Sequence, residues 1–171
     1  WKAQALLAYL TLNGQEHHRE ALATMFWPEQ GEAQARGSLR RALWTLRQAL
    51  ATDGLDGDKQ TLIFRHPAAL QVDVLQFQAA LAAGEAVENL RAAVTLYRND
   101  FLAGFTLPDC PLFDEWQFFT AERLRRQLAD ALQQLIAWDT GQQNYPAAIA
   151  AAQRWLALDP LHEPAHRLLM Q

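Results

Sequence analysis

The first third of the chain alternates apolar and polar positions with the period of an α-helix. Three amphipathic helices are predicted, over residues 1–12, 18–27 and 32–51. Gly14 ends the first, because glycine readily adopts the left-handed conformation of a helix stop. Pro28 ends the second, because proline disfavours helical geometry in the residue before it. The third helix carries a stripe of leucines that is predicted to be buried: Leu39, Leu43, Leu46 and Leu50.

The period changes to two after residue 60. Residues 61–64 are short, β-branched or aromatic, and Leu70, Val72 and Val74 alternate with polar neighbours. These two segments are predicted to form a β-hairpin with residues 65–69 as its loop. Three helices followed by a hairpin are the outline of a winged helix.

The pattern is helical again from residue 75 to the end. Helices are predicted over residues 75–81, 86–98, 113–140 and 146–158, with a loop over 101–111. Ala148, Ala152 and Pro160 fit the second helix of a tetratricopeptide unit. The predicted fold is therefore mainly α, with a partial winged helix followed by a tetratricopeptide-like array of helical hairpins.

Composition limits the size of the fold, the presence of a membrane span and the redox setting of the protein. With 171 residues, half of them apolar and a fifth charged, the chain is long enough for one ordinary domain or two small ones and is not disordered. No apolar run approaches the roughly 20 residues that span a membrane. The single Cys110 cannot form an internal disulfide, which favours a reducing, cytoplasmic setting. Helical patterns that begin at Trp1 and continue to Gln171 indicate a fragment of a longer chain.

Charge is unevenly distributed along the chain. Residues 1–66 carry a net charge of +1 and residues 67–171 a net charge of −5, for −4 overall. An acidic whole argues mildly against nucleic-acid binding. Residues 32–51, however, hold four arginines and a single acid, Glu32, so the third predicted helix is locally basic.

Helical spacing places Arg36, Arg40, Trp44 and Arg47 on one face of that helix, opposite the leucines. Guanidinium groups on such a face can bind phosphates or the O6 and N7 atoms of guanine. We expect Trp44 to pack against the hairpin or the second helix in preference to stacking or groove contact. A solvated arginine face is the alternative. Flanking side chains that can donate to phosphate or base edges are Ser38, Arg41, Thr45 and Gln48.

Other chemistry is less well supported. His17 and His18 are a poor metal site for two reasons. Adjacent side chains point apart, and no third ligand lies at helical spacing from them. His162, Glu163 and His166 match the short zinc-protease pattern, but Pro164 favours a structural role. No glycine-rich phosphate loop, nucleophile elbow or acid–base pair occurs, and neither an enzyme nor a cofactor is predicted.

Several collinear stretches resemble one family. LYRNDFLAGF (96–105), FDEW (113–116), ERLR (122–125) and LALDPLHEPAHRLLM (156–170) are similar to the bacterial transcriptional activator domain of the SARP-family antibiotic regulatory proteins. REAL (19–22), Trp27-Pro28, Leu39-Arg40 and Leu46-Arg47 resemble the OmpR-type winged helix that precedes this module in the family, and VDVLQF (72–77) resembles the junction.

The resemblance implies a winged-helix DNA-binding domain over residues 1–74 and the activator domain, with tetratricopeptide-like repeats, over 75–171. The third helix would enter the major groove, the wing with Arg65 and His66 would reach the minor groove, and residues 28–34 would face RNA polymerase. The activator domain would mediate self-association and polymerase contact. Three departures stand out: the sheet before the first helix is missing, Trp44 replaces a small hydroxyl residue, and the repeat array breaks off.

We therefore predict a transcriptional activator that binds double-stranded DNA, with RNA polymerase and a second copy of the chain as partners and no membrane. A protein-interaction module whose winged helix is purely structural is the alternative. A zinc hydrolase using His162 and His166 is a third reading.

Overall fold

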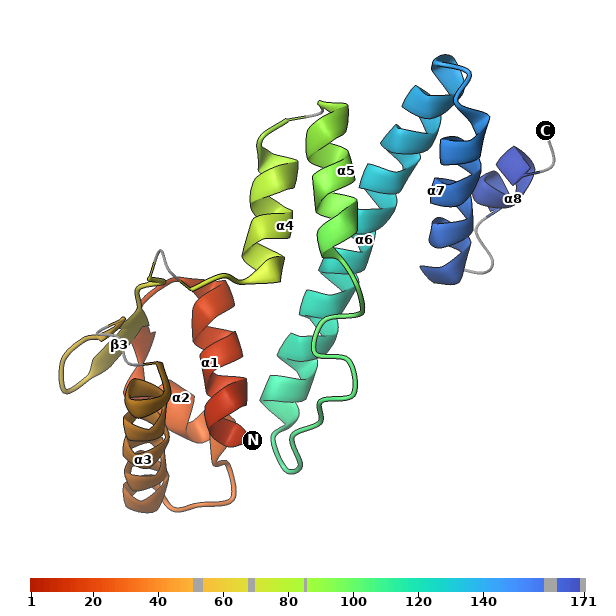
Figure 1. Cartoon of the computed structure of the whole chain (residues 1–171). Helices are drawn as coiled ribbons and strands as arrows, with labels where there is room; N and C mark the ends of the chain where they lie inside the picture. The colour runs from red at the N-terminus through yellow and green to blue at the C-terminus, as the bar shows by residue number, and fades with distance from the viewer. Residues whose placement is uncertain (51–53, 68–69, 85, 159–162, 170–171) are drawn as a thin grey trace. The chain divides into compact units, whose positions relative to one another are not determined.

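A computed structural model describes residues 1–50, 54–67, 70–84, 86–158 and 163–169. Over these residues the fold is mainly α-helical, with eight helices and a small antiparallel sheet (Figure 1). The chain forms two compact units. One consists of residues 1–71 and 104–118, and the other of residues 72–103 and 119–171. Each unit buries its own set of apolar side chains.

The first unit contains the three helices predicted from the sequence: α1 (Lys2–Asn13), α2 (Arg19–Phe26) and α3 (Glu32–Leu50). Gly14 ends α1 with a left-handed φ of 56°, as its lack of a Cβ allows. Trp27 caps the C-terminus of α2, one residue before Pro28. The predicted stop signals therefore end the helices where expected.

Three short strands form the sheet: β1 (His17–His18), β2 (Leu55–Asp56) and β3 (Thr61–Phe64). β3 lies between the other two and is antiparallel to both, with Leu55 opposite Phe64 and His17 opposite Leu62. The β2–β3 hairpin turns through Gly57, which has a φ of 137°. A Cβ there would lie 2.5 Å from the carbonyl oxygen of Thr61, so the turn requires glycine.

The predicted hairpin between residues 61–64 and 70–74 is wrong in its second strand. Residues 70–72 form no strand, and α4 begins at Asp73. β3 pairs instead with β2, which is upstream of it. A two-residue strand is too short to show an alternating pattern, so β2 left no signal in the sequence. Residues 68–69 of the predicted loop lie outside the described residues.

Residues 104–118, which include the first turns of α6 (Pro111–Gly141), complete the core of the first unit. Phe113 is fully buried, and its ring centroid lies 5.5 Å from that of Phe26. Cys110 is also buried, and its thiol donates to the carbonyl oxygen of Phe26 over 3.3 Å. Burial raises the pKa of the Cys110 thiol, which keeps it protonated and suits a packing role.

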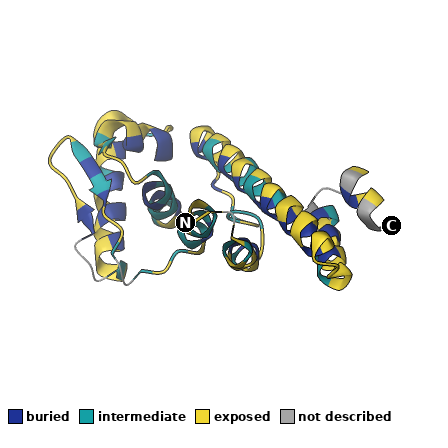
Figure 2. Ribbon diagram, turned by 90° about the horizontal axis from the view of Figure 1, so that it is seen from above, coloured by how far each residue is buried: buried dark blue, intermediate teal, exposed yellow. Residues whose placement is uncertain are grey.

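Helices are the only regular secondary structure among the described residues of the second unit. It contains α4 (Asp73–Ala82), α5 (Val87–Leu96), residues 119–141 of α6, α7 (Tyr145–Leu158) and α8 (Glu163–Leu169). α4 packs against α5, and α7 against α8. The long helix α6 carries both buried and exposed residues along its length (Figure 2). The core draws on all five helices, through residues such as Phe77, Leu90, Leu128, Leu132, Trp155 and Ala165.

Candidate nucleic-acid interface

Helix α3 has one apolar side and one polar side. Its buried residues are Ala35, Ser38, Leu39, Ala42, Leu43 and Leu46. The opposite side is exposed, and seven of the predicted site residues lie on it. We name this surface the α3 outward face and define it as Arg36, Arg40, Arg41, Trp44, Thr45, Arg47 and Gln48.

Two predicted hydroxyl donors are engaged within the protein. Ser38 is 6% exposed, and its Oγ donates to Oε1 of Gln30 (2.8 Å) and accepts from Nη2 of Arg41 (3.1 Å). The structure therefore does not bring Ser38 to the α3 outward face. Thr45 is exposed, but its hydroxyl donates to the carbonyl oxygen of Arg41 one turn earlier (3.0 Å), which leaves only its oxygen lone pairs for a ligand.

Trp44 is exposed over 65% of its surface. The prediction that it packs against the hairpin or the second helix is wrong. α1 and α2 pack against α3, and the leucine stripe is the part of α3 that is buried. Trp44 lies on the other side of the helix, so neither element covers it.

Several arginines of the site have contacts within the protein. Arg36 forms an ion pair with Glu32, and both side chains are more than half exposed. Nη2 of Arg47 donates to the carbonyl oxygen of Leu55 in β2 (3.3 Å). Exposed ion pairs contribute about 0–1 kcal/mol to stability, so a phosphate can replace the carboxylate of Glu32 at little cost.

Arg65 and His66 follow β3 and are exposed. Nε of Arg65 lies 3.2 Å from Oδ2 of Asp56 in an exposed ion pair. The period-two pattern predicted both residues in the loop of the hairpin. In the structure the hairpin is formed by β2 and β3, and its turn consists of residues 57–60, before β3. Arg65 and His66 follow β3 and therefore lie at the end of the hairpin opposite its turn.

An open groove of about 460 Å³ adjoins the α3 outward face. It is lined by Arg19, Arg36, Leu39, Arg40, Asp58 and Lys59. Arg19 and Lys59 were not among the predicted site residues. Arg19 begins α2, which packs against α3, and Lys59 lies in the turn of the β2–β3 hairpin, which was not predicted in this register. Their only sequence signal is their charge.

Asp58 organises the turn that carries Lys59. Its Oδ1 accepts hydrogen bonds from the backbone N–H groups of Gln60 and Thr61, both at 2.7 Å. These bonds hold the pKa of Asp58 below its usual value. The main-chain carbonyl of Asp58 accepts a hydrogen bond from Nε of Arg19 (2.8 Å), so this one residue fixes both cations at the edge of the groove.

The guanidinium of Arg19 is partly withdrawn from water and close to another cation. Burial, and secondarily the charge of Arg47, lower the pKa of Arg19. An anion bound in the groove would offset both effects, since it replaces lost hydration and screens the repulsion between the two arginines. Four cationic side chains and one carboxylate, that of Asp58, line the groove, and this excess of positive charge suits an anion such as a phosphate group.

The described residues contain no group of three His, Cys, Asp or Glu side chains arranged to hold a metal. The ring of His17 packs against Tyr9 with a centroid distance of 5.1 Å, and burial lowers the pKa of His17. His162 lies outside the described residues, and His166 is exposed on α8. The described residues therefore give the zinc-hydrolase reading no support.

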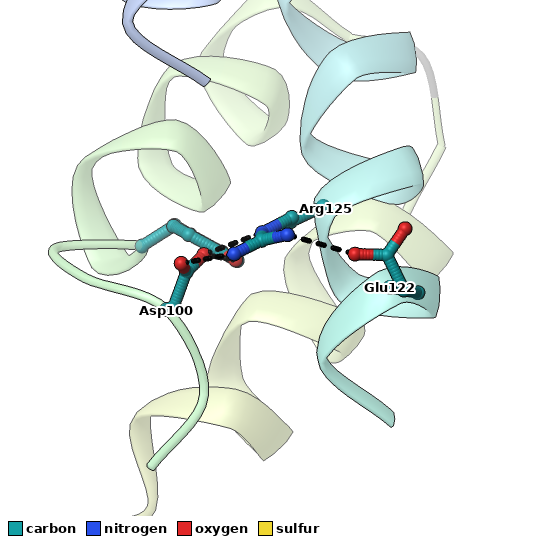
Figure 3. Close-up of polar contacts among 4 residues, drawn as sticks. Asp100, Glu122 and Arg125 are labelled. Carbon is teal, nitrogen blue, oxygen red and sulfur yellow. Dashed lines mark hydrogen bonds and ion pairs between the residues drawn. The ribbon is translucent and has the colours of Figure 1, made fainter. Parts of the chain in front are cut away.

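Two of the family-like stretches meet in the second unit (Figure 3). Arg125 binds both carboxylate oxygens of Asp100, with Nε at 2.8 Å from Oδ1, and its Nη1 donates to Oε1 of Glu122 (2.7 Å). The hydroxyl of Tyr97 also donates to Oδ1 of Asp100 (3.1 Å). This charge-assisted network ties the segment after α5 to α6, which gives the residues of both stretches a structural role.

The network shifts the protonation of its members. The guanidinium of Arg125 holds the pKa of Asp100 below its usual range. Burial, with the charge of Asp100 as a second cause, raises the pKa of Tyr97 to about 12.

Comparison with known proteins identifies the family. Residues 68–171 match the family model of the bacterial transcriptional activator domain. No curated protein matches the chain. None of the helices among the described residues is long and apolar enough to cross a membrane. Since the matched segment is more than half of the sequence, the chain belongs to the bacterial transcriptional activator domain family and has a role in bacterial transcription activation.

Proposed function

We propose that this activator binds double-stranded DNA through its first unit. In this proposal, α2, α3 and the β2–β3 hairpin act as an OmpR-type winged helix, and α3 enters the major groove. The second unit acts as the activation module, which contacts RNA polymerase or a second copy of the chain. The observation that carries the proposal is the α3 outward face, where four arginines and Trp44 project from a helix anchored by its buried leucines.

The chemistry of that face suits DNA. Arginine binds guanine O6 and N7 with two hydrogen bonds, which is the commonest specific base contact. Arg40 is exposed and also lines the groove. The cations of the groove, Arg19 and Lys59 among them, would hold the phosphate backbone beside the helix. Base contacts on α3 and phosphate contacts in the groove would thus fix the register of the protein on the duplex.

The second unit has exposed apolar side chains that suit a protein partner. Tyr145 is 57% exposed and Ile149 is 43% exposed. They lie four residues apart on α7 and therefore on one face of that helix. Dimerisation on repeated half-sites would also increase discrimination, because a single small module of this kind buries limited DNA surface.

A protein-interaction module with a purely structural first unit is the second candidate. The net charge of +1 over residues 1–66 is low for a DNA-binding domain. The exposure of Trp44 also suits a protein partner, since tryptophan is enriched at protein interfaces.

Selection of duplexes from a random DNA pool with the full chain tests the proposal. The enriched duplex is then titrated by fluorescence anisotropy over a range of salt concentrations. We expect Arg40→Ala to weaken binding to that duplex by about 10- to 100-fold if Arg40 contacts a base, or to lower the salt slope by about one if it contacts a phosphate. Arg123→Ala, which removes an exposed arginine of α6, is the matched control and should bind as the wild type does.

Absence of an enriched sequence, with equally weak binding by wild type and Arg40→Ala, would overturn the proposal. The protein-interaction module would then be the better description.

A further inference from the structure

Trp44 lies at the centre of the α3 outward face. Arg40 and Gln48 are one helical turn away on either side, and Arg41 and Arg47 are three residues away. All four of these neighbours are exposed, and so is Trp44, at 65%. Among the described residues, none forms a ring contact or hydrogen bond with the indole. The largest side chain of this surface is thus without a partner among the residues that the structure describes.

A single exposed apolar side chain is common on protein surfaces, so exposure alone does not mark Trp44 as a binding residue. Here the surroundings indicate which class of partner. Three of the four neighbours of Trp44 are arginines, and the fourth is an amide, so the indole is an apolar point within a basic surface. A protein partner would need acidic groups around an apolar pocket, whereas the major groove of DNA already combines phosphates with apolar methyl groups.

We propose that Trp44 reads thymine methyl groups and is a specificity-determining residue for DNA; this inference rests on the proposed function. Thymine C5-methyl groups are the apolar features of the major-groove edge. An indole carried into the groove by α3 contacts them, while its Nε1–H can only donate, to acceptors such as O4 of thymine or N7 of a purine.

Helix geometry gives Trp44 its own place in the binding site. Side chains one turn apart are separated by about 5.4 Å along a helix, and neighbouring bases by about 3.4 Å along a strand. Arg40 and Gln48 therefore contact base pairs on either side of the one that faces Trp44. The enriched sequence should contain thymine between positions read by polar side chains.

Replacement of thymine by deoxyuridine tests the inference, because it removes the methyl group and leaves the base-pairing edge unchanged. The full chain is titrated with the enriched duplex and with duplexes that carry deoxyuridine at one thymine at a time. A buried methyl group contributes about 0.8 kcal/mol, which corresponds to about a fourfold loss of affinity. We expect this loss at one or two central thymines and no change at flanking ones.

Trp44→Ser should bind the original duplex more weakly and should no longer distinguish thymine from deoxyuridine. Trp1→Ser, which changes a tryptophan that is 77% exposed at the start of α1, should keep the wild-type methyl dependence. Far-UV circular dichroism and urea unfolding of both variants separate a loss of recognition from a loss of folding.

The outcomes separate this inference from the proposed function. An enriched sequence whose affinity does not depend on any thymine methyl would overturn the role of Trp44 and leave DNA binding intact. Wild-type affinity and methyl dependence in Trp44→Ser would do the same, and would direct attention to a protein partner for this residue. Failure of the wild type to bind any duplex specifically would overturn both proposals.

Discussion

The hydroxyl of Tyr97 makes the stability of the second unit sensitive to alkaline pH. Tyr97 is 8% exposed, its ring lies 5.6 Å from that of Phe77, and its hydroxyl donates to Oδ1 of Asp100. Tyr97→Phe removes the hydroxyl and keeps the ring in the core. The variant therefore isolates the ionisable group from its packing.

The effect of Tyr97→Phe on the free energy of unfolding is expected to change sign with pH. Burial, followed by the charge of Asp100, raises the pKa of Tyr97 from 10.0 to about 12. The stability gained from the neutral phenol is thus fully present below pH 10 and is lost as the pH rises towards 12, by about 2–3 kcal/mol. Tyr97→Phe has no such loss, but lacks a hydrogen bond that contributes about 1 kcal/mol. The wild type should be the more stable protein at pH 8 and the less stable one at pH 12.

Urea unfolding of the full chain between pH 8 and 12, followed by far-UV circular dichroism, measures this difference. Tyr145→Phe, at a position that is 57% exposed on α7, controls for the removal of a phenol as such. Groups that ionise in both proteins cancel in the comparison. A constant difference in free energy of unfolding between wild type and Tyr97→Phe from pH 8 to 12 would refute the reasoning.

The same approach applies to two other contacts. Gly57→Ala should destabilise the first unit by about 2 kcal/mol, because the φ of Gly57 is 137° and a Cβ would lie 2.5 Å from the carbonyl oxygen of Thr61. Urea unfolding measures this loss of stability. Gly31→Ala is the control, because nothing lies within 4 Å of a Cβ at that position. At acid pH, Arg125 holds the pKa of Asp100 below its usual value of 3.8, so their contribution to stability is present above that pH and is lost as the pH falls through the lowered pKa. The difference in urea midpoint between wild type and Arg125→Ala should therefore shrink as the pH falls from 6 to 2, and a difference that stays constant over this range would contradict this.

The helices were predictable because their signal is local. A buried stripe of period 3.6, ended by Gly14 or Pro28, places a helix without knowledge of the rest of the chain. The hairpin was not predictable in this way. Leu70, Val72 and Val74 alternate over five residues, yet the partner of β3 is the two-residue strand β2. Strand pairing is decided by burial and by a turn that only Gly57 allows, and neither shows as periodicity.

The candidate site was predictable only where its residues lie on a single helix. Helical spacing placed Arg36, Arg40 and Arg47 on the exposed side of α3, as the structure shows. The groove was missed because Lys59 comes near α3 only through the hairpin, and because the sequence does not show that Arg19, at the start of α2, faces the same groove. The exposure of Trp44 was missed for another reason. A tryptophan is usually covered, and the sequence does not show that the elements packed on α3 leave that side of the helix open.

Arg36 and Arg65 in the first unit are held less firmly by their carboxylate partners than Arg91 in the second unit. Arg36 and Arg65 pair with carboxylates that are themselves more than half exposed, so these contacts are weak and easily exchanged. Arg91 in the second unit binds Asp139, whose side chain is only 1% exposed, at 2.6 Å. Removing Arg91 would leave a buried charge with a weaker set of partners, which is costly. Loss of Arg36 or Arg65 should therefore have little effect on stability, and loss of Arg91 should change whether the second unit stays folded.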